Sequence, residues 1–587
     1  MTAPPQVSPT DVLPPTSGIP KRQRWRGARG SGVRAWLVLA VVGSATLVPL
    51  ALLLVNSLNI ASVNEPVRYG LDNWRAAFAD PAVGEAAWNT FRLGLTRTLI
   101  AVVIASILAW LIARTDMPGG HVAEILFYLA FFVPSISMTL GWILVLDPST
   151  GVLNEAIRAV FGSESSQGPL TPYGFWGIIW VHLSSSTVPI ITVLIIPAMR
   201  RMSTALEEAA ATCGASRWST ARRITLPLML PSLLGAALLG FLASLKAFEI
   251  ELLLGVPVGL HVYSTQIYEW VSDAPPAYGI ATALGAVFVP VMVVLAGIHR
   301  FISTRRSYVT VGAHTYSDQP VRLGKVGRWI VAGLVAAYIG VTLVVPLAAM
   351  VTGSLMRRFG FFELENPITT HHWMALFDDN LLMSSVRNSL VLGLSATVLG
   401  VAVYFSIAYI VVRSRLSTRG ATDIMAWLPV ALPGILLGLG LLWLYLGTPL
   451  RTVLYGNVVG LTLAIIIGHM AVGTQQMKAG LLQLSPDLEK AARVSGANPR
   501  KATLHVLLPL LGPTVAATAI LTFDAAIRDI STVVLLSSRN SRPMSILLLE
   551  YSTGGELERA AAMGVLMSLV TVTVALVARR LTKGAIR

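Results

Sequence analysis

The fold is decided by a polar stretch that the chain contains twice, as STALEEAAATCGASRWSTARRITLP at residues 203–227 and as SPDLEKAARVSGANPRKATLHVLLP at residues 485–509. The two copies align without a gap, so that residues 282 positions apart correspond, as Gly214 and Gly496 do. Ungapped correspondence over so long a separation indicates a chain that consists of two homologous halves.

Each copy predicts a short helix, a turn and the beginning of a second helix. Thr204 and Glu207 form a capping-box pattern in the first copy, and Gly214 can adopt the left-handed conformation that ends a helix. We therefore expect helices over residues 204–213 and 486–495. Their alanines leave smooth faces that another protein can approach closely.

The composition is that of a polytopic membrane protein. The 587 residues are 54% hydrophobic and 12% charged, and the mean hydropathy is +0.69. The net charge of +15 does not require a nucleic-acid partner, because basic residues gather on the cytoplasmic side of membrane proteins. The single cysteine, Cys213, excludes an intramolecular disulfide.

Apolar runs long enough to cross about 30 Å of hydrocarbon predict twelve spans, six in each half. Most basic residues outside these runs fall on the side that holds both polar stretches and both termini, so this side is expected to be cytoplasmic. The predicted spans are residues 35–55, 88–113, 122–146, 173–198, 225–250, 277–298, 329–352, 388–412, 424–447, 457–477, 506–536 and 560–578.

The expected domain organisation follows from these spans. Residues 1–34 form a basic, disordered, cytoplasmic tail, residues 35–298 the first repeat, residues 299–328 a cytoplasmic linker, and residues 329–587 the second repeat. Because each repeat has an even number of spans, both cross the membrane in the same sense. This all-α arrangement is one of parallel repeats about an axis along the membrane normal, with a translocation path between them.

The duplication extends beyond the polar stretch. Residues 299 positions apart correspond upstream of it, as in Arg114 and Arg413. Pro134 and Pro433 also correspond, and both lie inside predicted spans. These prolines predict kinks in otherwise continuous helices.

The pattern Glu208-Ala209-Ala210 with Gly214 four residues further on resembles the EAA loop of the membrane subunits of ABC importers. In that family the first helix of the loop couples the closure of a cytoplasmic ATPase to the membrane helices. The second copy departs from the motif, because Lys490 stands where the glutamate is expected. The resemblance implies ATPase-coupling roles for Thr204, Glu207, Glu208, Ala209, Ala210, Gly214, Glu489, Lys490, Ala491, Ala492 and Gly496.

The whole chain after the tail is similar to fused permeases of the iron(III), thiamine and 2-aminoethylphosphonate branch of these importers. The similarity implies a type I ABC importer permease fold in a bacterial inner membrane. It also implies two copies of an ATPase subunit, an external substrate-binding protein and a small cargo, with ferric iron expected first. Cargo of 2-aminoethylphosphonate, thiamine or polyamine is the alternative.

Six charged residues lie in or beside spans, where a charge costs about 2.5 to 3.5 kcal/mol on insertion scales. One interpretation is that each half neutralises itself, through Lys246 with Glu249 and Asp524 with Arg528. The other is that the charges line the path, where Lys246 and its counterpart Arg528 would face each other. The candidate pathway residues are Lys246, Glu249, Glu251, Asp524, Arg528 and Asp529.

The chain contains no phosphate-binding loop of the G-x-x-x-x-G-K-[ST] type. We therefore expect no enzyme activity and no cofactor in this chain, with ATP and Mg²⁺ bound by the partner ATPase, and no metal site, since no ligand set has the usual spacing. The competing class is a proton-coupled secondary transporter, which also has twelve spans in two parallel repeats. A duplicated coupling loop is not typical of that class.

Overall fold

The structure is a computed structural model that describes residues 28–61, 66–161, 166–202, 205–305, 321–361, 364, 366–414, 416–449 and 451–584. Within these ranges the chain is all-α, and β pairing is limited to three isolated bridges. The first half consists of α1 (Ala28–Ser57), α2 (Asp72–Ala79), α3 (Pro81–Arg114), α4 (Gly120–Phe132), α5 (Ser135–Leu146), α6 (Val152–Phe161), α7 (Phe175–His182), α8 (Val188–Arg201), α9 (Ala205–Thr212), α10 (Arg217–Thr220), α11 (Leu226–Leu245), α12 (Glu249–Leu254), α13 (Tyr263–Ser272) and α14 (Tyr278–Arg305).

The second half follows a similar order, with the four-residue helix α21 at the position of the ten-residue α6 and, among the described residues, no helix at the position of α12. It consists of α15 (Gly324–Ile339), α16 (Val345–Leu355), α17 (His371–Asp378), α18 (Asn380–Arg413), α19 (Thr418–Trp427), α20 (Gly434–Leu446), α21 (Arg451–Leu454), α22 (Val458–Gln483), α23 (Asp487–Val494), α24 (Pro499–Ala502), α25 (Leu508–Leu510), α26 (Gly512–Arg528), α27 (Met544–Thr553) and α28 (Leu557–Gly584).

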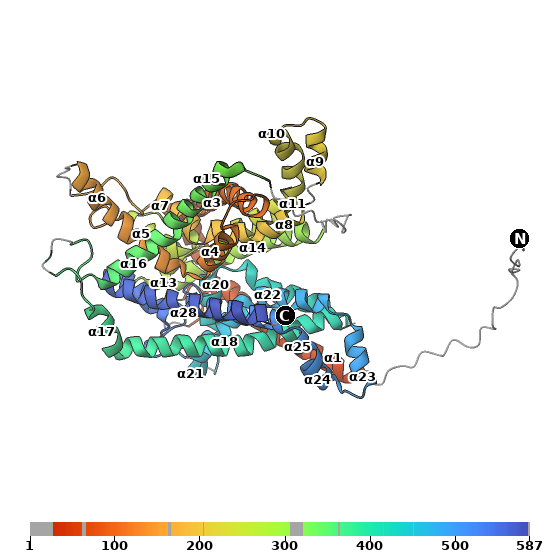
Figure 1. Cartoon of the computed structure of the whole chain (residues 1–587). Coiled ribbons are helices and arrows are strands. Elements are labelled where there is room, and N and C mark those ends of the chain that lie inside the picture. The colour runs from red at the N-terminus through yellow and green to blue at the C-terminus, as the bar shows by residue number, and fades with distance from the viewer. Residues whose placement is uncertain are drawn as a thin grey trace, which may run out of the picture.

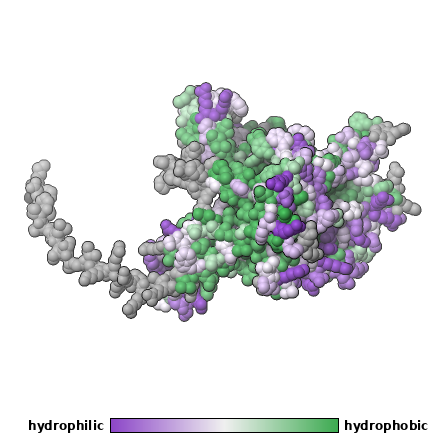
Figure 2. All heavy atoms as spheres, turned by 180° about the vertical axis from the view of Figure 1, so that it is seen from behind, coloured by the Kyte–Doolittle hydropathy of each residue, from purple (hydrophilic) through white to green (hydrophobic). Residues whose placement is uncertain are grey.

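Nine helices among the described residues are long and apolar enough to cross a membrane. Three further pairs pass the same test only together, because each is bent at a break. With each bent pair counted as one span, the described chain has up to twelve, in agreement with the sequence. The exposed residues Leu99, Val103 and Ile107 recur every four positions along α3, so this helix presents an apolar stripe to lipid. Figure 2 shows hydrophobic residues gathered over the middle of one face of the molecule.

The two prolines break their helices rather than kink them, so the prediction of continuous spans is wrong there. α4 and α5 meet at 100° around Pro134, and the segments flanking Pro433 meet at 110°. The physical reason is local, because a proline forces the residue before it out of the helical region. Val133 accordingly has φ −74° and ψ 127°, and Leu432 has φ −106° and ψ 130°.

Three other predicted boundaries also change. The predicted span 506–536 falls in a third bent pair, in which the segment Pro499–Leu510 and α26 meet at 78° and the helix ends at Arg528. Residues 28–34, expected in a disordered tail, are the first turns of α1, because the apolar helix extends into its basic flank. Residues 1–27 lie outside the described residues. α14 and α15 enter the predicted linker 299–328 from its two ends.

The first span of each half, which is α1 or the continuous pair α15–α16, packs against the broken helix of the other half. α1 contacts α19 and α20, whereas α16 contacts α5. Each also contacts the last helix of its own half, α14 or α28. In Figure 1, α1 lies among the blue and cyan helices of the second half, and green α16 lies beside α5 of the first half. The two halves are therefore interleaved.

Two glycines permit this interleaving. A Cβ atom at Gly141 of α5 would lie 2.4 Å from the carbonyl oxygen of Pro346, and one at Gly440 of α20 would lie 2.9 Å from that of Pro49. Gly440 stands 299 positions after Gly141, so the same close approach occurs once in each direction. Small residues are typical of such contacts between membrane helices.

We expect Gly141→Ala to destabilise the purified chain by about 1–3 kcal/mol, because the added methyl group overpacks against a backbone oxygen that cannot swing away. The measurement is the thermal unfolding midpoint in detergent. Gly235→Ala is the matched control, because Gly235 also lies in a membrane helix and nothing lies within 4 Å of its Cβ position. Equal midpoints for the two variants would contradict the packing argument.

Candidate functional site

The repeated polar stretches form matching helical hairpins, α9–α10 and α23–α24, at one end of the molecule. In Figure 1 both lie at the right, whereas α6 and α17 lie at the left-hand end. α9 spans Ala205–Thr212 and α23 spans Asp487–Val494, so each is eight residues long. The sequence predicted the same helices with slightly wider bounds, and Thr204 lies outside the described residues.

Both short helices end in the predicted glycine cap. Gly214 has φ +81° and Gly496 has φ +90°, which a residue with a side chain rarely adopts. Behind each glycine the chain closes the helix with a backbone hydrogen bond of 2.9 Å, from Ala215 to Ala210 in α9 and at the equivalent positions after α23. The turn that presents each hairpin is therefore the same in both halves.

One ion pair in each half ties the short helix to a long membrane helix. Arg114, the last residue of α3, pairs with Glu207. Arg413, the last residue of α18, pairs with Glu489 at 3.3 Å. Thr225 donates to Glu207 at 2.7 Å, so that carboxylate is held from both sides. Glu207 and Glu489 are therefore structural anchors, and the partnership with Arg114 and Arg413 was not predicted.

The other predicted coupling residues point away from the body. Glu208, Ala209 and Ala491 are exposed, and Ala210 and Ala492 are half-buried. Lys490 is exposed too and pairs with Asp487 at 2.8 Å. Its ammonium group donates a hydrogen bond that lowers the pKa of the Asp487 carboxyl. The difference between Glu208 and Lys490 thus lies on a free face rather than in the anchor.

The cations Lys246 and Arg528 each reach into the opposite half. Lys246 Nζ donates to the carbonyl oxygen of Val430 at 3.0 Å, and Arg528 Nη1 donates to that of Phe131. Val430 stands 299 positions after Phe131, so the two contacts are equivalent. The two cations thus make a reciprocal exchange of hydrogen bonds between the halves, and their facing each other across the path stays a prediction.

These contacts satisfy carbonyl groups that the helix breaks leave free. Phe131 and Val430 each lie three residues before the proline of a broken helix, at a helical C-terminus. The last carbonyls of a helix lack partners within it and carry partial negative charge. A cation from the other half is therefore well placed there. We call the two contacts, Lys246 with Val430 and Arg528 with Phe131, the reciprocal caps.

The predicted neutralisation within each half is right for one pair and wrong for the other. Arg528 Nε lies 3.2 Å from Asp524 Oδ2. Lys246 does not pair with Glu249, because α11 ends at Leu245 and the chain turns before α12 begins, which removes the helical spacing. Glu249 instead accepts a hydrogen bond from the Ser135 hydroxyl.

Each half also joins a carboxylate to a histidine. Glu251 Oε1 lies 2.7 Å from His182 Nε2 and 3.8 Å from Arg97 Nη1, and all three side chains are buried. In the second half, Asp529 lies 3.8 Å from His469. Neither His182 nor Arg97 was predicted as a partner of Glu251. The recurrence of a histidine in both halves could have indicated the first partner, whereas Arg97 has no repeated counterpart.

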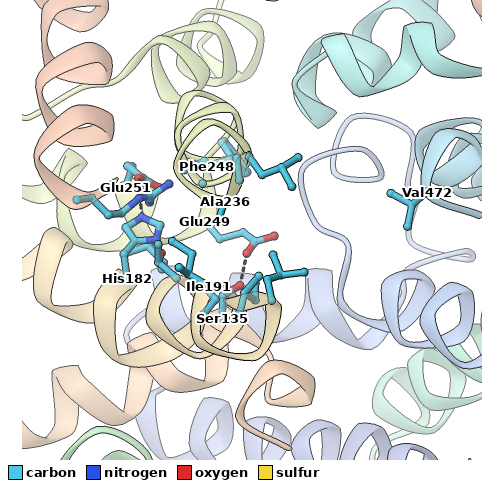
Figure 3. A pocket seen from close by; sticks show the side chains of 18 residues that line it. Ser135, His182, Ile191, Ala236, Phe248, Glu249, Glu251 and Val472 are labelled. Carbon is cyan, nitrogen blue, oxygen red and sulfur yellow. Dashed lines mark hydrogen bonds and ion pairs between the residues drawn. The ribbon is translucent and has the colours of Figure 1, made fainter. Parts of the chain in front are cut away.

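A cavity of about 520 Å³ lies beside α12. It brings together two of the six predicted pathway residues, Glu249 and Glu251, and Figure 3 shows Val472 of α22 opposite them. Among the described residues, no group of three or more His, Cys, Asp or Glu side chains is arranged to hold a metal ion. The cavity is lined by Arg97, Ser135, His182, Ser186, Thr187, Ile190, Ile191, Leu194, Ala236, Leu239, Gly240, Ala243, Ala247, Phe248, Glu249, Ile250, Glu251 and Val472.

Two permeases of iron transport systems and one solved ABC transporter are similar to this chain. The ferric transport system permease protein FbpB of Actinobacillus pleuropneumoniae is 25% identical over 496 residues, which cover 82% of this chain and 68% of that protein. The Fe(3+)-transport system permease protein FbpB 2 of Haemophilus influenzae is 21% identical and covers 83% and 88%. A solved bacterial ABC transporter that imports the polysaccharide alginate matches 43% of this chain and 95% of its own, with 16% identity and a TM-score of 0.37.

The family assignment rests on a model of the binding-protein-dependent transport system inner membrane component. That model matches residues 86–308 and matches again at residues 396–587. Together the two matches cover more than half of the chain, and each falls in one of the two six-span halves. The chain therefore belongs to the family of inner-membrane permeases of binding-protein-dependent ABC importers, and it carries the permease domain twice in the parallel arrangement of the type I fold.

Proposed function

We propose that this permease imports ferric iron, and that two copies of a separate ATPase drive it by binding the α9–α10 and α23–α24 hairpins. A binding protein delivers the cargo at the opposite face. ATP and Mg²⁺ are bound by the ATPase copies, and this chain contributes the path. The hairpins and both termini lie in the cytoplasm, because basic residues are concentrated on that side.

The observation that carries this proposal is the matched pair of hairpins. They share the glycine cap, the anchoring ion pair and an apolar residue at the same exposed position, Leu206 or Leu488. Trp218 is 77% exposed and Val494 is 89% exposed, beyond the apolar band that faces lipid. Large apolar side chains exposed in water mark a protein interface. Two hairpins with the same cap and the same anchor, which differ in exposed side chains such as Glu208 and Lys490, fit two copies of an ATPase.

The anchors connect these surfaces to the long membrane helices α3 and α18. When the ATPase copies close, α9 and α23 move with them, and the pairs Arg114 with Glu207 and Arg413 with Glu489 transmit the movement to α3 and α18. These helices cross the whole membrane without a break. Separation of the halves then breaks the reciprocal caps and opens the path between them.

Ferric iron is proposed because two relatives that match most of this chain are permeases of ferric transport systems. Their identity of 21–25% supports the same transport class more firmly than the same cargo. Importers of 2-aminoethylphosphonate, thiamine or polyamine therefore remain the comparison cases in any transport assay.

The test is transport by the full chain reconstituted in liposomes with its ATPase and its binding protein loaded with radioactive ferric iron. We expect iron uptake to require ATP on the side of the membrane that the hairpins face, and to stop when ATP is omitted. Uptake that persists without ATP and follows an imposed proton gradient would instead identify a secondary transporter. ATP-dependent uptake of another solute, without uptake of iron, would change the cargo and leave the class intact.

A further inference from the structure

We propose that the cavity beside α12 is a cation-binding site built by the first half alone, with Glu249 as the group that contacts the cation. The proposal deepens the proposed function, because it places a resting site for a positively charged cargo on the path. It concerns a single site in a chain whose other functional features all occur twice.

Glu249 shares the cavity with hydroxyl groups from two other segments. Glu249 is held there by the hydroxyl of Ser135, the first residue of α5. Figure 3 shows the Glu249 carboxylate directed at Ser135, inside the ring of lining side chains. Ser186 and Thr187 line the same space from the segment between α7 and α8. Carboxylate and hydroxyl oxygens are the donors that hard cations and ammonium groups prefer.

The charges of the lining leave an excess of one negative charge. Glu251 is compensated, because Arg97 lies 3.8 Å from its Oε1 atom and His182 contacts the same oxygen. The neighbouring cations are engaged elsewhere, since Lys246 caps the second half and Arg528 pairs with Asp524. Glu249 is therefore the one carboxylate of the described lining that forms no ion pair within 4 Å, although the charge of Arg528 acts on it from farther away. Attraction for a positive ligand is strong where protein walls exclude water.

A second observation also points to a ligand. Glu251 is 3% exposed, and among the described residues its Oε2 atom has no hydrogen-bond donor. Buried polar atoms are normally satisfied by protein or by a bound species. Glu251 also lines the cavity, and an ammonium group or a cation-bound water that reached Oε2 would supply the missing donor. The volume of about 520 Å³ lies within the range of small-molecule sites.

Arg97, Glu249 and Glu251 have no charged counterparts at the corresponding positions of the second half, whereas a carboxylate–histidine contact recurs there between Asp529 and His469. The side of the path formed by the second half contributes Val472 to this lining and no charge. The positions corresponding to Arg97, Ser135, Glu249 and Glu251 are Ala396, Gly434, Ser531 and Val533.

The experiment measures equilibrium binding to the purified full chain, without ATPase or binding protein, so that it is independent of driven transport. The probes are radioactive ferric iron kept soluble with citrate and, separately, radioactive spermidine. We expect saturable binding of at least one probe, weakened at least tenfold by Glu249→Gln. Ser531→Ala, the matched change in the second half, is expected to leave binding within twofold of the parent.

Glu249→Asp keeps the charge and controls for folding, and it is expected to bind more tightly than Glu249→Gln. Binding of either probe that depends on Glu249 supports the site, and the probe that binds identifies the cation as a metal or an organic amine. Equal binding by the parent and Glu249→Gln, or no saturable binding by a folded parent, overturns it. Failure of ATP-driven iron uptake with Glu249-dependent binding intact would instead count against the proposed function alone.

Discussion

Removal of both reciprocal caps is expected to raise ATP hydrolysis in the absence of binding protein by about tenfold or more. A hydrogen bond from a charged group contributes about 1.5–3 kcal/mol, and 1.4 kcal/mol corresponds to a tenfold population change. The caps join the halves across the path, so their loss favours the separated state that the ATPase otherwise has to produce. The test is the basal hydrolysis rate of the reconstituted transporter.

The variant must not leave a buried acid unpaired. Arg528 also pairs with Asp524, which is 3% exposed on its side chain, and an orphaned buried carboxylate destabilises a protein by about 3–5 kcal/mol. The variant is therefore Lys246→Met with Arg528→Met and Asp524→Asn. Arg92→Met is the control, because Arg92 lies in α3 and stacks on Phe175 within its own half. Basal hydrolysis within twofold of the parent, in a folded triple variant, would show that the caps do not hold the path closed.

Loss of the two anchors is expected to uncouple hydrolysis from transport. In the double variant Glu207→Gln and Glu489→Gln, the short helices lose their charged link to α3 and α18, while their exposed faces are unchanged. Arg114 and Arg413 are about 10% exposed on their side chains, so each broken pair costs about 2 kcal/mol or more. We expect iron uptake to fall at least tenfold, whereas the ATPase still co-purifies with the chain.

The measurement is the ratio of iron transported to ATP hydrolysed. Glu155→Gln is the matched control, because Glu155 pairs with Arg158 on α6 at the opposite end of the molecule. An unchanged ratio in the double variant would show that movement of the hairpins reaches the membrane helices by another route. Loss of ATPase binding would show that the anchors shape the docking surface itself.

Local features of the site were predictable from sequence because they depend on a few neighbouring residues. The caps at Gly214 and Gly496 follow from the backbone freedom of glycine, and the Asp524–Arg528 pair follows from helical spacing. The predicted pair of Lys246 with Glu249 was wrong, because it assumed that one helix continues through both residues, whereas α11 ends at Leu245. The severity of the breaks at Pro134 and Pro433 was underestimated, because a break becomes tolerable only when another half supplies partners for the freed carbonyls.

Contacts between segments that are far apart in the sequence, within one half or between the halves, were not predictable. The repeat offset identified Lys246 and Arg528 as equivalents, but it could not show which carbonyl each reaches. Glu251 was chosen for its charge, whereas its partners Arg97 and His182 lie on separate helices and meet it only in the folded chain. The interleaving of the two halves likewise depends on close approach at Gly141 and Gly440. A glycine in an apolar run does not indicate which segment will pack against it.

The interleaving of α1 and α16 has a consequence for biogenesis and for subunit composition. When α1 enters the membrane, α19 and α20 have not yet been synthesised, so its final packing waits until most of the chain has been inserted. Premature association of two first halves would pair two copies of the half that contains the charged cavity. Joining both halves in one polypeptide raises the effective concentration of the correct partner. The covalent link thus enforces a one-to-one ratio and a heterologous pairing that separate, similar subunits would have to achieve by recognition.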